Sequence, residues 1–232
     1  MEREVEFKLG RQTLRGSFFI PQGKGPFPSV IFFHGSGGDG ETHFKLAKVL
    51  SENGILGFAF NYRGCGKSEG KFENQTISMG IKDAKAAVDF LLSQKEVDRT
   101  RMGFGGGSFG GFISCLLSAE SKPKSLLLIA PAAYSKESYK IHRDSDERLR
   151  GNFENSESYK NLFKFKGQLL VIKSEFDDVL PVGMVERYLE KAKNVTKKEE
   201  FILKGAKHRI SINPAAQKIL TNKVKDWFVK TL

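Results

Sequence analysis

Cysteine is scarce in this chain: Cys65 and Cys115 are the only two among 232 residues. Two cysteines cannot form a disulfide framework, and neither stands in a Cys-x-x-Cys pair, so the sequence predicts free thiols in a reducing compartment. The opening stretch, MEREVEFKLG, is charged and lacks the apolar segment of a secretory signal. No apolar run approaches the roughly 18 residues that a membrane span needs. We therefore expect a cytoplasmic protein with no membrane partner.

Acidic residues are outnumbered: 38 Lys and Arg stand against 27 Asp and Glu, a net charge of +11. Much of the excess lies from Tyr159 onward, where 16 basic residues face 8 acidic ones. The lysines at 191–198 are interrupted by small residues, have no aromatic residues among them and are followed by two glutamates. This pattern is typical of solvated helix faces, so we expect no specific nucleic-acid partner.

Strand and helix patterns alternate along the chain, and 39% apolar residues can form a large core. Continuous apolar runs predict buried strands at Ser29–Phe33, Ile55–Asn61, Ser125–Ala130 and Gln168–Lys173. Helical periodicity predicts helices at Thr42–Asn53, Thr76–Leu92, Pro181–Ala192 and Pro214–Leu232. The alternation predicts an α/β fold, a mostly parallel sheet with helices on both faces, formed by one domain over residues 1–232. The least periodic segment, about 132–166, is expected to be a short cap.

The segment Gly106–Gly110 has the pattern G-x-S-x-G between a predicted strand and a predicted helix. In that setting a sharp turn exposes the central hydroxyl, and side chains two positions either side would collide with the turn. The pattern predicts Ser108 as a nucleophile. Two alternatives are a glycine turn that only packs helix against strand, and a dinucleotide-binding loop at 103–108. The second is disfavoured because the sixth position is serine and no acidic residue follows at a second strand end.

A serine nucleophile needs a base and an acid that orients the base. His208 follows the last predicted strand, and Asp177 follows the strand QLLVIK. Both would therefore lie at carboxyl ends of strands, where catalytic groups gather in parallel sheets. The order Ser108, Asp177, His208 is that of an α/β-hydrolase. The alternatives are Asp178 as the acid, Asp177 as a helix cap, and His208 as a surface residue.

The glycine-rich loop His34–Gly38 directly follows the buried strand SVIFF. Such a loop can aim a backbone N–H at a developing oxyanion, and the residue after the nucleophile usually supplies a second N–H. We therefore expect Ser36 and Phe109 to form an oxyanion hole and His34 to fill space beside the loop. No second His or carboxylate lies at ligand spacing from His34, so we expect no metal and no cofactor.

Together these residues resemble the α/β-hydrolase family over nearly the whole chain. The matching pieces are His34–Gly38, Asn61–Ser68, Gly106–Gly110, Asp177–Pro181 and Gly205–His208. The resemblance implies an eight-stranded, mostly parallel sheet with a short cap between strands 6 and 7. It also implies Ser108 as nucleophile, His208 as general base, Asp177 as acid, and Ser36 and Phe109 as oxyanion donors. Asn61 stands where the family often has Asp.

Within the family, Gly70–Asn74 and the helix after it are most similar to small bacterial esterases of the cinnamoyl and feruloyl type. The resemblance implies a serine carboxylic ester hydrolase that acts on small or medium acyl esters through an acyl-enzyme. The alternatives are a serine peptidase or thioesterase with the same triad, and a non-catalytic hydrolase-like binding protein. The expected partner is a small-molecule ester, and the chain is expected to be a monomer or a homodimer. The cap segment around Tyr134, Tyr139, His142, Phe153 and Tyr159 is expected to contribute pocket walls.

Overall fold

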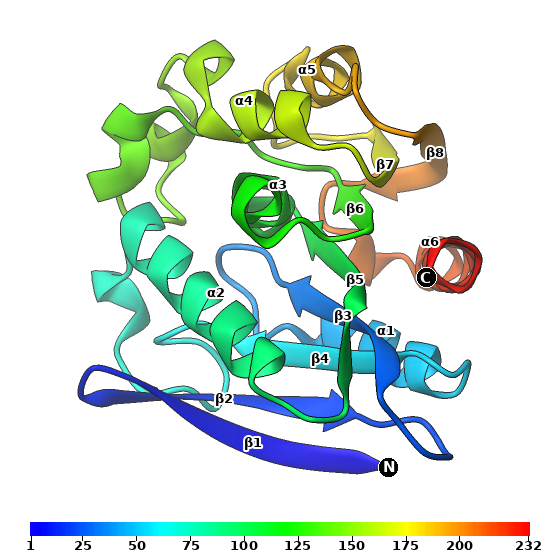
Figure 1. Cartoon of the computed structure of the whole chain (residues 1–232). Helices are drawn as coiled ribbons and strands as arrows, with labels where there is room; N and C mark the ends of the chain where they lie inside the picture. Colours follow the sequence, from blue (N-terminus) through cyan, green and yellow to red (C-terminus); the bar gives the residue numbers. More distant parts are fainter.

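A single eight-stranded sheet organises the computed structural model, which describes residues 1–232 (Figure 1). The strands are β1 (Glu2–Leu9), β2 (Gln12–Phe19), β3 (Phe27–Phe33), β4 (Leu56–Asn61), β5 (Val97–Gly107), β6 (Ser125–Ile129), β7 (Gln168–Phe176) and β8 (Lys197–Lys207). Their order across the sheet is β1-β2-β4-β3-β5-β6-β7-β8. The pairs β1–β2 and β2–β4 are antiparallel, and all other neighbours are parallel. The predicted mostly parallel sheet is confirmed.

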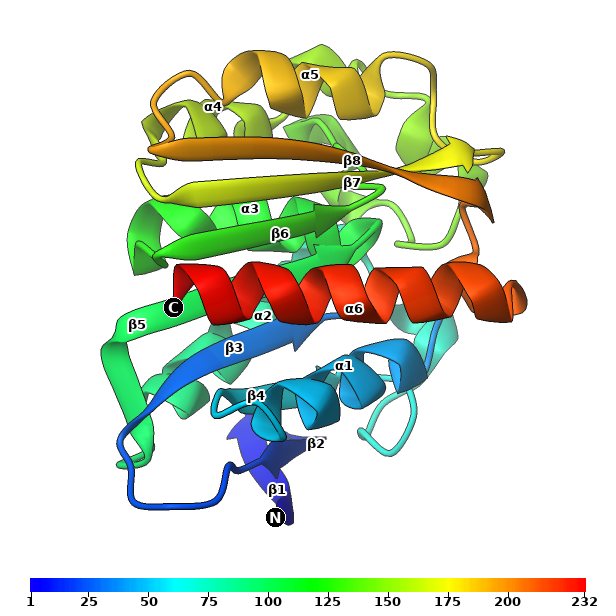
Figure 2. The ribbon, with the colours of Figure 1, turned by 90° about the vertical axis from the view of Figure 1, so that its right-hand side faces the viewer.

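Helices cover both faces of the sheet. They are α1 (Glu41–Ser51), α2 (Ile77–Leu92), α3 (Phe109–Ser121), α4 (Glu157–Lys164), α5 (Met184–Lys191) and α6 (Pro214–Thr231). Figure 2 shows α1 and α6 in front of the sheet, while α2, α3, α4 and α5 lie on its other face. This arrangement is the α/β-hydrolase fold that the sequence resemblance implies. None of the helices combines the length and the apolar character that a bilayer crossing needs.

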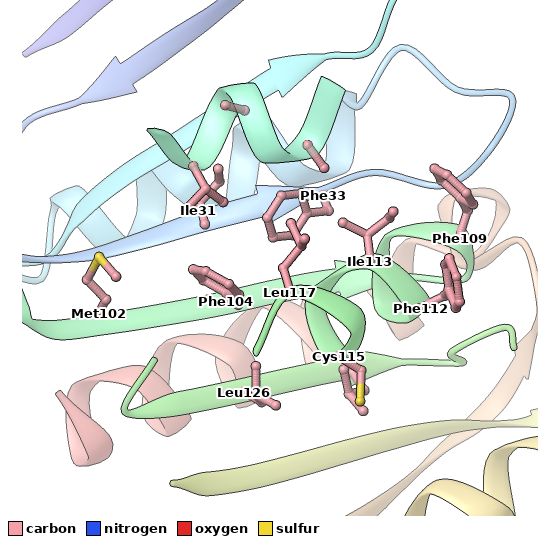
Figure 3. Packing of buried hydrophobic residues seen from close by; sticks show 14 of the residues in the cluster. Ile31, Phe33, Met102, Phe104, Phe109, Phe112, Ile113, Cys115, Leu117 and Leu126 are labelled. Atoms are coloured by element: carbon pink, nitrogen blue, oxygen red, sulfur yellow. The ribbon is translucent and has the colours of Figure 1, made fainter. Parts of the chain in front are cut away.

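The central strands are buried on both faces, which explains why their sequences are continuous apolar runs. All six residues of β4 are buried. On the α2–α5 face, the rings of Phe33 and Phe104 meet edge to face with centroids 5.6 Å apart. Figure 3 shows the Phe33 ring beside Ile113 and Leu117 of α3. Burying each such phenylalanine contributes about 2–3 kcal/mol, so this layer holds α3 firmly against the sheet.

Residues 130–167 connect β6 to β7 and form the short cap. The cap contains three 3-10 turns (Lys136–Lys140, Asp146–Leu149 and Phe153–Asn155), followed by α4. An isolated antiparallel bridge between His142 and Thr76 ties the cap to the start of α2. The parallel strands β3, β5, β6, β7 and β8 all run in one direction, so the loops after β3, β5, β7 and β8 emerge at the same end of the sheet as the cap, which follows β6.

Candidate active site

Ser108 lies in the tight turn between β5 and α3. Its backbone φ of 51° and ψ of −115° fall outside the regions that residues other than glycine normally occupy. Strand and helix approach so closely that a Cβ on Gly106 would lie 2.2 Å from the carbonyl oxygen of Gly110. A Cβ on Gly110 would lie 1.8 Å from the carbonyl oxygen of Phe33. Glycine is therefore required at both positions, and the strained turn presents the Ser108 hydroxyl at the sheet edge.

Ser108, His208 and Asp177 meet in one chain of hydrogen bonds. Ser108 Oγ and His208 Nε2 are 3.0 Å apart, and His208 Nδ1 and Asp177 Oδ2 are 2.8 Å apart. Asp177 follows β7 and His208 follows β8, so the ends of two parallel strands deliver both groups. Their side chains are only 17% and 13% exposed. When Asp177 accepts a hydrogen bond from the Nδ1–H group of His208, Nε2 is left unprotonated and can accept the proton of the Ser108 hydroxyl.

Two adjacent carboxylates follow β7, and the structure places Asp177 against the His208 ring. Asp177 Oδ1 also accepts hydrogen bonds from the N–H groups of Val179 and Leu180, each at 3.0 Å. Burial acts to raise the pKa of Asp177, but the hydrogen bonds from His208 and from these N–H groups outweigh it and hold that pKa below its ordinary value. Asp178 instead faces the backbone N–H of His208 at 3.4 Å. The carboxylate at the ring is therefore ionised at neutral pH.

Two backbone N–H groups near Ser108 donate to no protein atom. Phe109 is the first residue of α3, so its N–H has no acceptor within the helix. The N–H of Ser36, in the loop after β3, also has no acceptor. A Cβ on Gly35 of that loop would lie 3.9 Å from the Cβ of Ser108, so the loop reaches the nucleophile candidate. An oxyanion hole formed by Ser36 and Phe109 stays a prediction, and this geometry is compatible with it.

The imidazole rings of His34 and His43 lie beside the site and are neutral at physiological pH. The N–H of Tyr62 donates to His34 Nε2 at 3.3 Å, and His34 Nδ1 lies 2.7 Å from the carbonyl oxygen of Gly35. This pattern requires the proton of His34 on Nδ1. Burial, helped by the charge of Arg143, lowers the pKa of His34 to about 3. Burial lowers the pKa of His43, whose Nε2 has no partner, to about 4.

These imidazoles predict a loss of stability in acid. Between the ordinary pKa of 6.5 and about 4, the unfolded chain binds a proton at His43 and the folded chain does not. The free energy of unfolding therefore falls as pH falls through this window. Denaturant unfolding at pH 7.5 and pH 5 should show a smaller pH dependence for His43→Leu than for the parent, roughly halved if His34 contributes equally. Equal pH dependence in both proteins would contradict the assignment.

A cavity of about 590 Å³ opens over Ser108 and His208. Residues 34–43, which comprise the loop after β3 and the first turn of α1, form one wall, residues 208–211 form another, and Asp144 and Arg148 of the cap contribute to the lining. The cap does contribute to the pocket walls, through Asp144 and Arg148, but none of the five residues named for this role lines the cavity. Tyr134 and Tyr159 are each 1% exposed and belong to the core instead.

Several lining residues could not be anticipated from the sequence, among them His43, Asp144 and Arg148. His43 belongs to the first turn of α1 and reads in the sequence as part of an ordinary amphipathic helix. Asp144 and Arg148 belong to the aperiodic cap, where the spacing of residues carries no structural signal. No group of three or more His, Cys, Asp or Glu side chains is placed to hold a metal ion.

Comparison with known proteins identifies relatives across most of the chain. Residues 42–232 match the model of the prolyl oligopeptidase family, Peptidase S9. An uncharacterized protein of Mycobacterium tuberculosis is 28% identical over 179 residues, which are 77% of this chain and 63% of that protein. Esterase EstD of Thermotoga maritima is 31% identical over 131 residues, 52% of this chain and 31% of the esterase. The chain thus spans less than two thirds of the length of these relatives.

Solved structures share the fold. Est1E from Butyrivibrio proteoclasticus, solved with ferulic acid, superposes with a TM-score of 0.77 and 20% identity over 98% of both chains. The acylaminoacyl peptidase of Pyrococcus horikoshii superposes with a TM-score of 0.77 and 21% identity over all of this chain and 41% of the peptidase. At these identities the likeness concerns the fold alone. Because the family model covers 42–232, well over half of the residues, the chain belongs to the prolyl oligopeptidase family and has the α/β-hydrolase fold.

Proposed function

We propose that the chain is a serine carboxylic ester hydrolase. Ser108 Oγ attacks the acyl carbon of the ester while His208 Nε2 takes the hydroxyl proton. The negative charge that develops on the acyl oxygen accepts hydrogen bonds from the N–H groups of Ser36 and Phe109. His208 then returns the proton to the leaving alcohol, which leaves an acyl-enzyme. A water molecule, deprotonated by the same imidazole, releases the acid and restores Ser108.

The observation that carries this proposal is the hydrogen-bonded chain from Ser108 Oγ through His208 to Asp177, at 3.0 and 2.8 Å. The nucleophile candidate lies on a strained turn at the N-terminus of α3, which favours developing negative charge. Ionised Asp177 would stabilise the imidazolium that forms when His208 takes the proton. The cavity of about 590 Å³ is in the range of small-molecule sites and supports small or medium acyl esters.

An ester is the favoured substrate class for two reasons. Esterase EstD is among the sequence relatives, and Est1E, which was solved with ferulic acid bound, superposes over 98% of its chain. A serine peptidase is the second candidate, because the family is that of prolyl oligopeptidase and the acylaminoacyl peptidase shares the fold. An aromatic acyl group such as feruloyl is less favoured, since the cap lines the cavity with Asp144 and Arg148 and with none of its aromatic rings.

A matched substrate panel tests the proposal. The purified protein is assayed against p-nitrophenyl esters from acetyl to octanoyl, the corresponding p-nitroanilides, acyl-coenzyme A thioesters and methyl ferulate. We expect kcat/KM for the best p-nitrophenyl ester to exceed that for the matched anilide by at least roughly a hundredfold. Faster turnover of anilides would favour the peptidase, and faster turnover of thioesters a thioesterase. Inertness toward the whole panel would favour a non-catalytic binding protein.

A further inference from the structure

The loop Gly35–Gly38 is held to the rest of the protein by very few hydrogen bonds. Its backbone N–H groups donate to no backbone acceptor. The carbonyl oxygen of Gly35 faces His34 Nδ1, the side chain of the neighbouring residue. From Ser36 to Gly38 the one hydrogen bond to protein runs from Ser36 Oγ to Asp144 Oδ1, at 2.9 Å. This bond joins the loop to the cap, 108 positions away in the sequence.

Asp144 approaches the loop closely enough to fix its position. A Cβ on Gly37 would lie 3.0 Å from Asp144 Oδ2, so the carboxylate lies against the backbone beyond Ser36 as well. Ser36 is 8% exposed, whereas the Asp144 side chain is 46% exposed. The hydrogen bond therefore lies at the rim of the cavity, with the serine on the inside and the carboxylate facing solvent.

The cap segment that carries Asp144 is itself anchored, through the two residues before Asp144, to the residues that precede α2. The N–H of Arg143 donates to the carbonyl oxygen of Gln75 at 3.0 Å, and the ring of His142 bonds the carbonyl oxygen of Phe72 at 2.9 Å. Four residues after Asp144, the guanidinium of Arg148 lies 3.8 Å from the carboxylate. Asp144 thus projects from a fixed segment rather than from a free loop.

Arg143 adds a second link between this cap segment and the candidate site. Its side chain is fully buried, and its guanidinium carbon lies over the rings of Tyr62, Phe72 and Phe109 at 4.9, 5.2 and 5.9 Å from their centroids. Phe109 supplies one of the two expected oxyanion donors, and Asp144 holds the residue that supplies the other. Two consecutive cap residues therefore contact both donor residues.

We propose that Asp144 is a positioning residue, which holds the loop so that the Ser36 N–H points at the developing oxyanion. The inference rests on the proposed function above. The hydrogen bond from the Ser36 N–H strengthens as charge develops on the acyl oxygen. A loop that moves away therefore weakens the binding of the transition state more than the binding of the substrate. Removing the Asp144 carboxylate should therefore lower kcat and leave KM nearly unchanged.

Four variants separate this role from a general effect on the cap. Asp144→Ala and Ser36→Ala each remove the hydrogen bond, while the backbone N–H of Ser36 remains. Asp144→Asn keeps an acceptor oxygen for the Ser36 hydroxyl but removes the charge that faces Arg148. Asp146→Ala is the matched control, because Asp146 is an exposed cap carboxylate with no ion-pair or side-chain hydrogen-bond partner.

We expect Asp144→Ala and Ser36→Ala each to lower kcat for the best p-nitrophenyl ester by roughly tenfold, with KM changed by less than about twofold. The double variant should be no slower than the slower single variant, because both changes break the same bond. Asp144→Asn should stay within about threefold of the parent, and Asp146→Ala should match it. The affinity for an alkyl boronic acid, which forms a tetrahedral adduct on the serine, should fall in parallel with kcat.

Three results would overturn the inference: Asp144→Ala behaving like Asp146→Ala, additive losses in the double variant, or Asp144→Asn as slow as Asp144→Ala. Failure of the proposed function itself is recognised separately, by Ser108→Ala hydrolysing the ester at the parent rate. Inactive Ser108→Ala together with unaffected Asp144→Ala would refute only the role of Asp144.

Discussion

Ser108→Ala should lower kcat/KM for a short p-nitrophenyl ester by at least roughly ten-thousandfold, because the variant has no hydroxyl to form the acyl-enzyme. His208 and Asp177 would remain hydrogen-bonded to each other at 2.8 Å, yet they have no nucleophile to activate. The residual rate should come only from substrate binding and the two backbone donors. Initial rates at substrate concentrations well below KM measure this ratio directly.

A matched serine provides the control for this loss. Ser211 also lines the cavity, and its hydroxyl makes no hydrogen bond with another residue. Ser211→Ala should keep kcat/KM within about threefold of the parent, and both variants should unfold at the parent temperature within about 3 °C. If Ser108→Ala hydrolyses the ester as fast as Ser211→Ala, Ser108 is not the nucleophile.

Gly110→Ala should abolish cooperative folding or lower the free energy of unfolding by more than about 4 kcal/mol. The new Cβ would lie 1.8 Å from the carbonyl oxygen of Phe33 and 2.4 Å from its carbon. Both atoms belong to the backbone of β3, so no side-chain rotation can relieve the overlap. The helix α3 would have to move away from the sheet and lose packing of the kind shown in Figure 3. Denaturant unfolding followed by circular dichroism measures the loss.

Gly38→Ala is the control for this substitution. The nearest atom to a Cβ on Gly38 is the backbone nitrogen of Gly40, at 3.7 Å, which is an ordinary contact. This variant should unfold within about 1 kcal/mol of the parent. An equally small change for Gly110→Ala would mean that strand and helix are not as close at the turn as the structure places them.

Much of the fold could be predicted because local patterns and tertiary packing agree. Thr76 stands at the predicted start of α2 and is of a residue type that caps helices, and its Oγ1 accepts a hydrogen bond from the N–H of Met79 at 3.2 Å. For α6, the apolar residues Ile219, Val224, Trp227 and Phe228 predict the inward face, but Ile219 is 44% exposed, whereas Leu220 is buried. The buried stripe of α6 runs through 216, 220, 224 and 227–228. Ile219 lies one position away from that stripe. The hydrophobicity of the residues alone does not determine how α6 is rotated about its own axis.

The candidate site likewise contains residues that the sequence indicates and residues that it does not. Ser108, Asp177 and His208 could be proposed because parallel strands end at one edge, so residues that follow those strands converge. Nothing local in the sequence indicates Asp144, because its contact with Ser36 joins two irregular segments 108 positions apart. Tyr134 was misplaced for a related reason. An aperiodic segment does not reveal which of its side chains face the core.

The most direct test of the central claim is the site of covalent labelling by an alkyl fluorophosphonate, determined by mass spectrometry of the intact protein and its peptides. We expect a single adduct on Ser108 in the parent protein. We expect no adduct in Ser108→Ala and much slower labelling in His208→Ala, because the hydroxyl then lacks its base. A stoichiometric adduct on another residue, or undiminished labelling of Ser108→Ala, would contradict the assignment of Ser108 as the nucleophile.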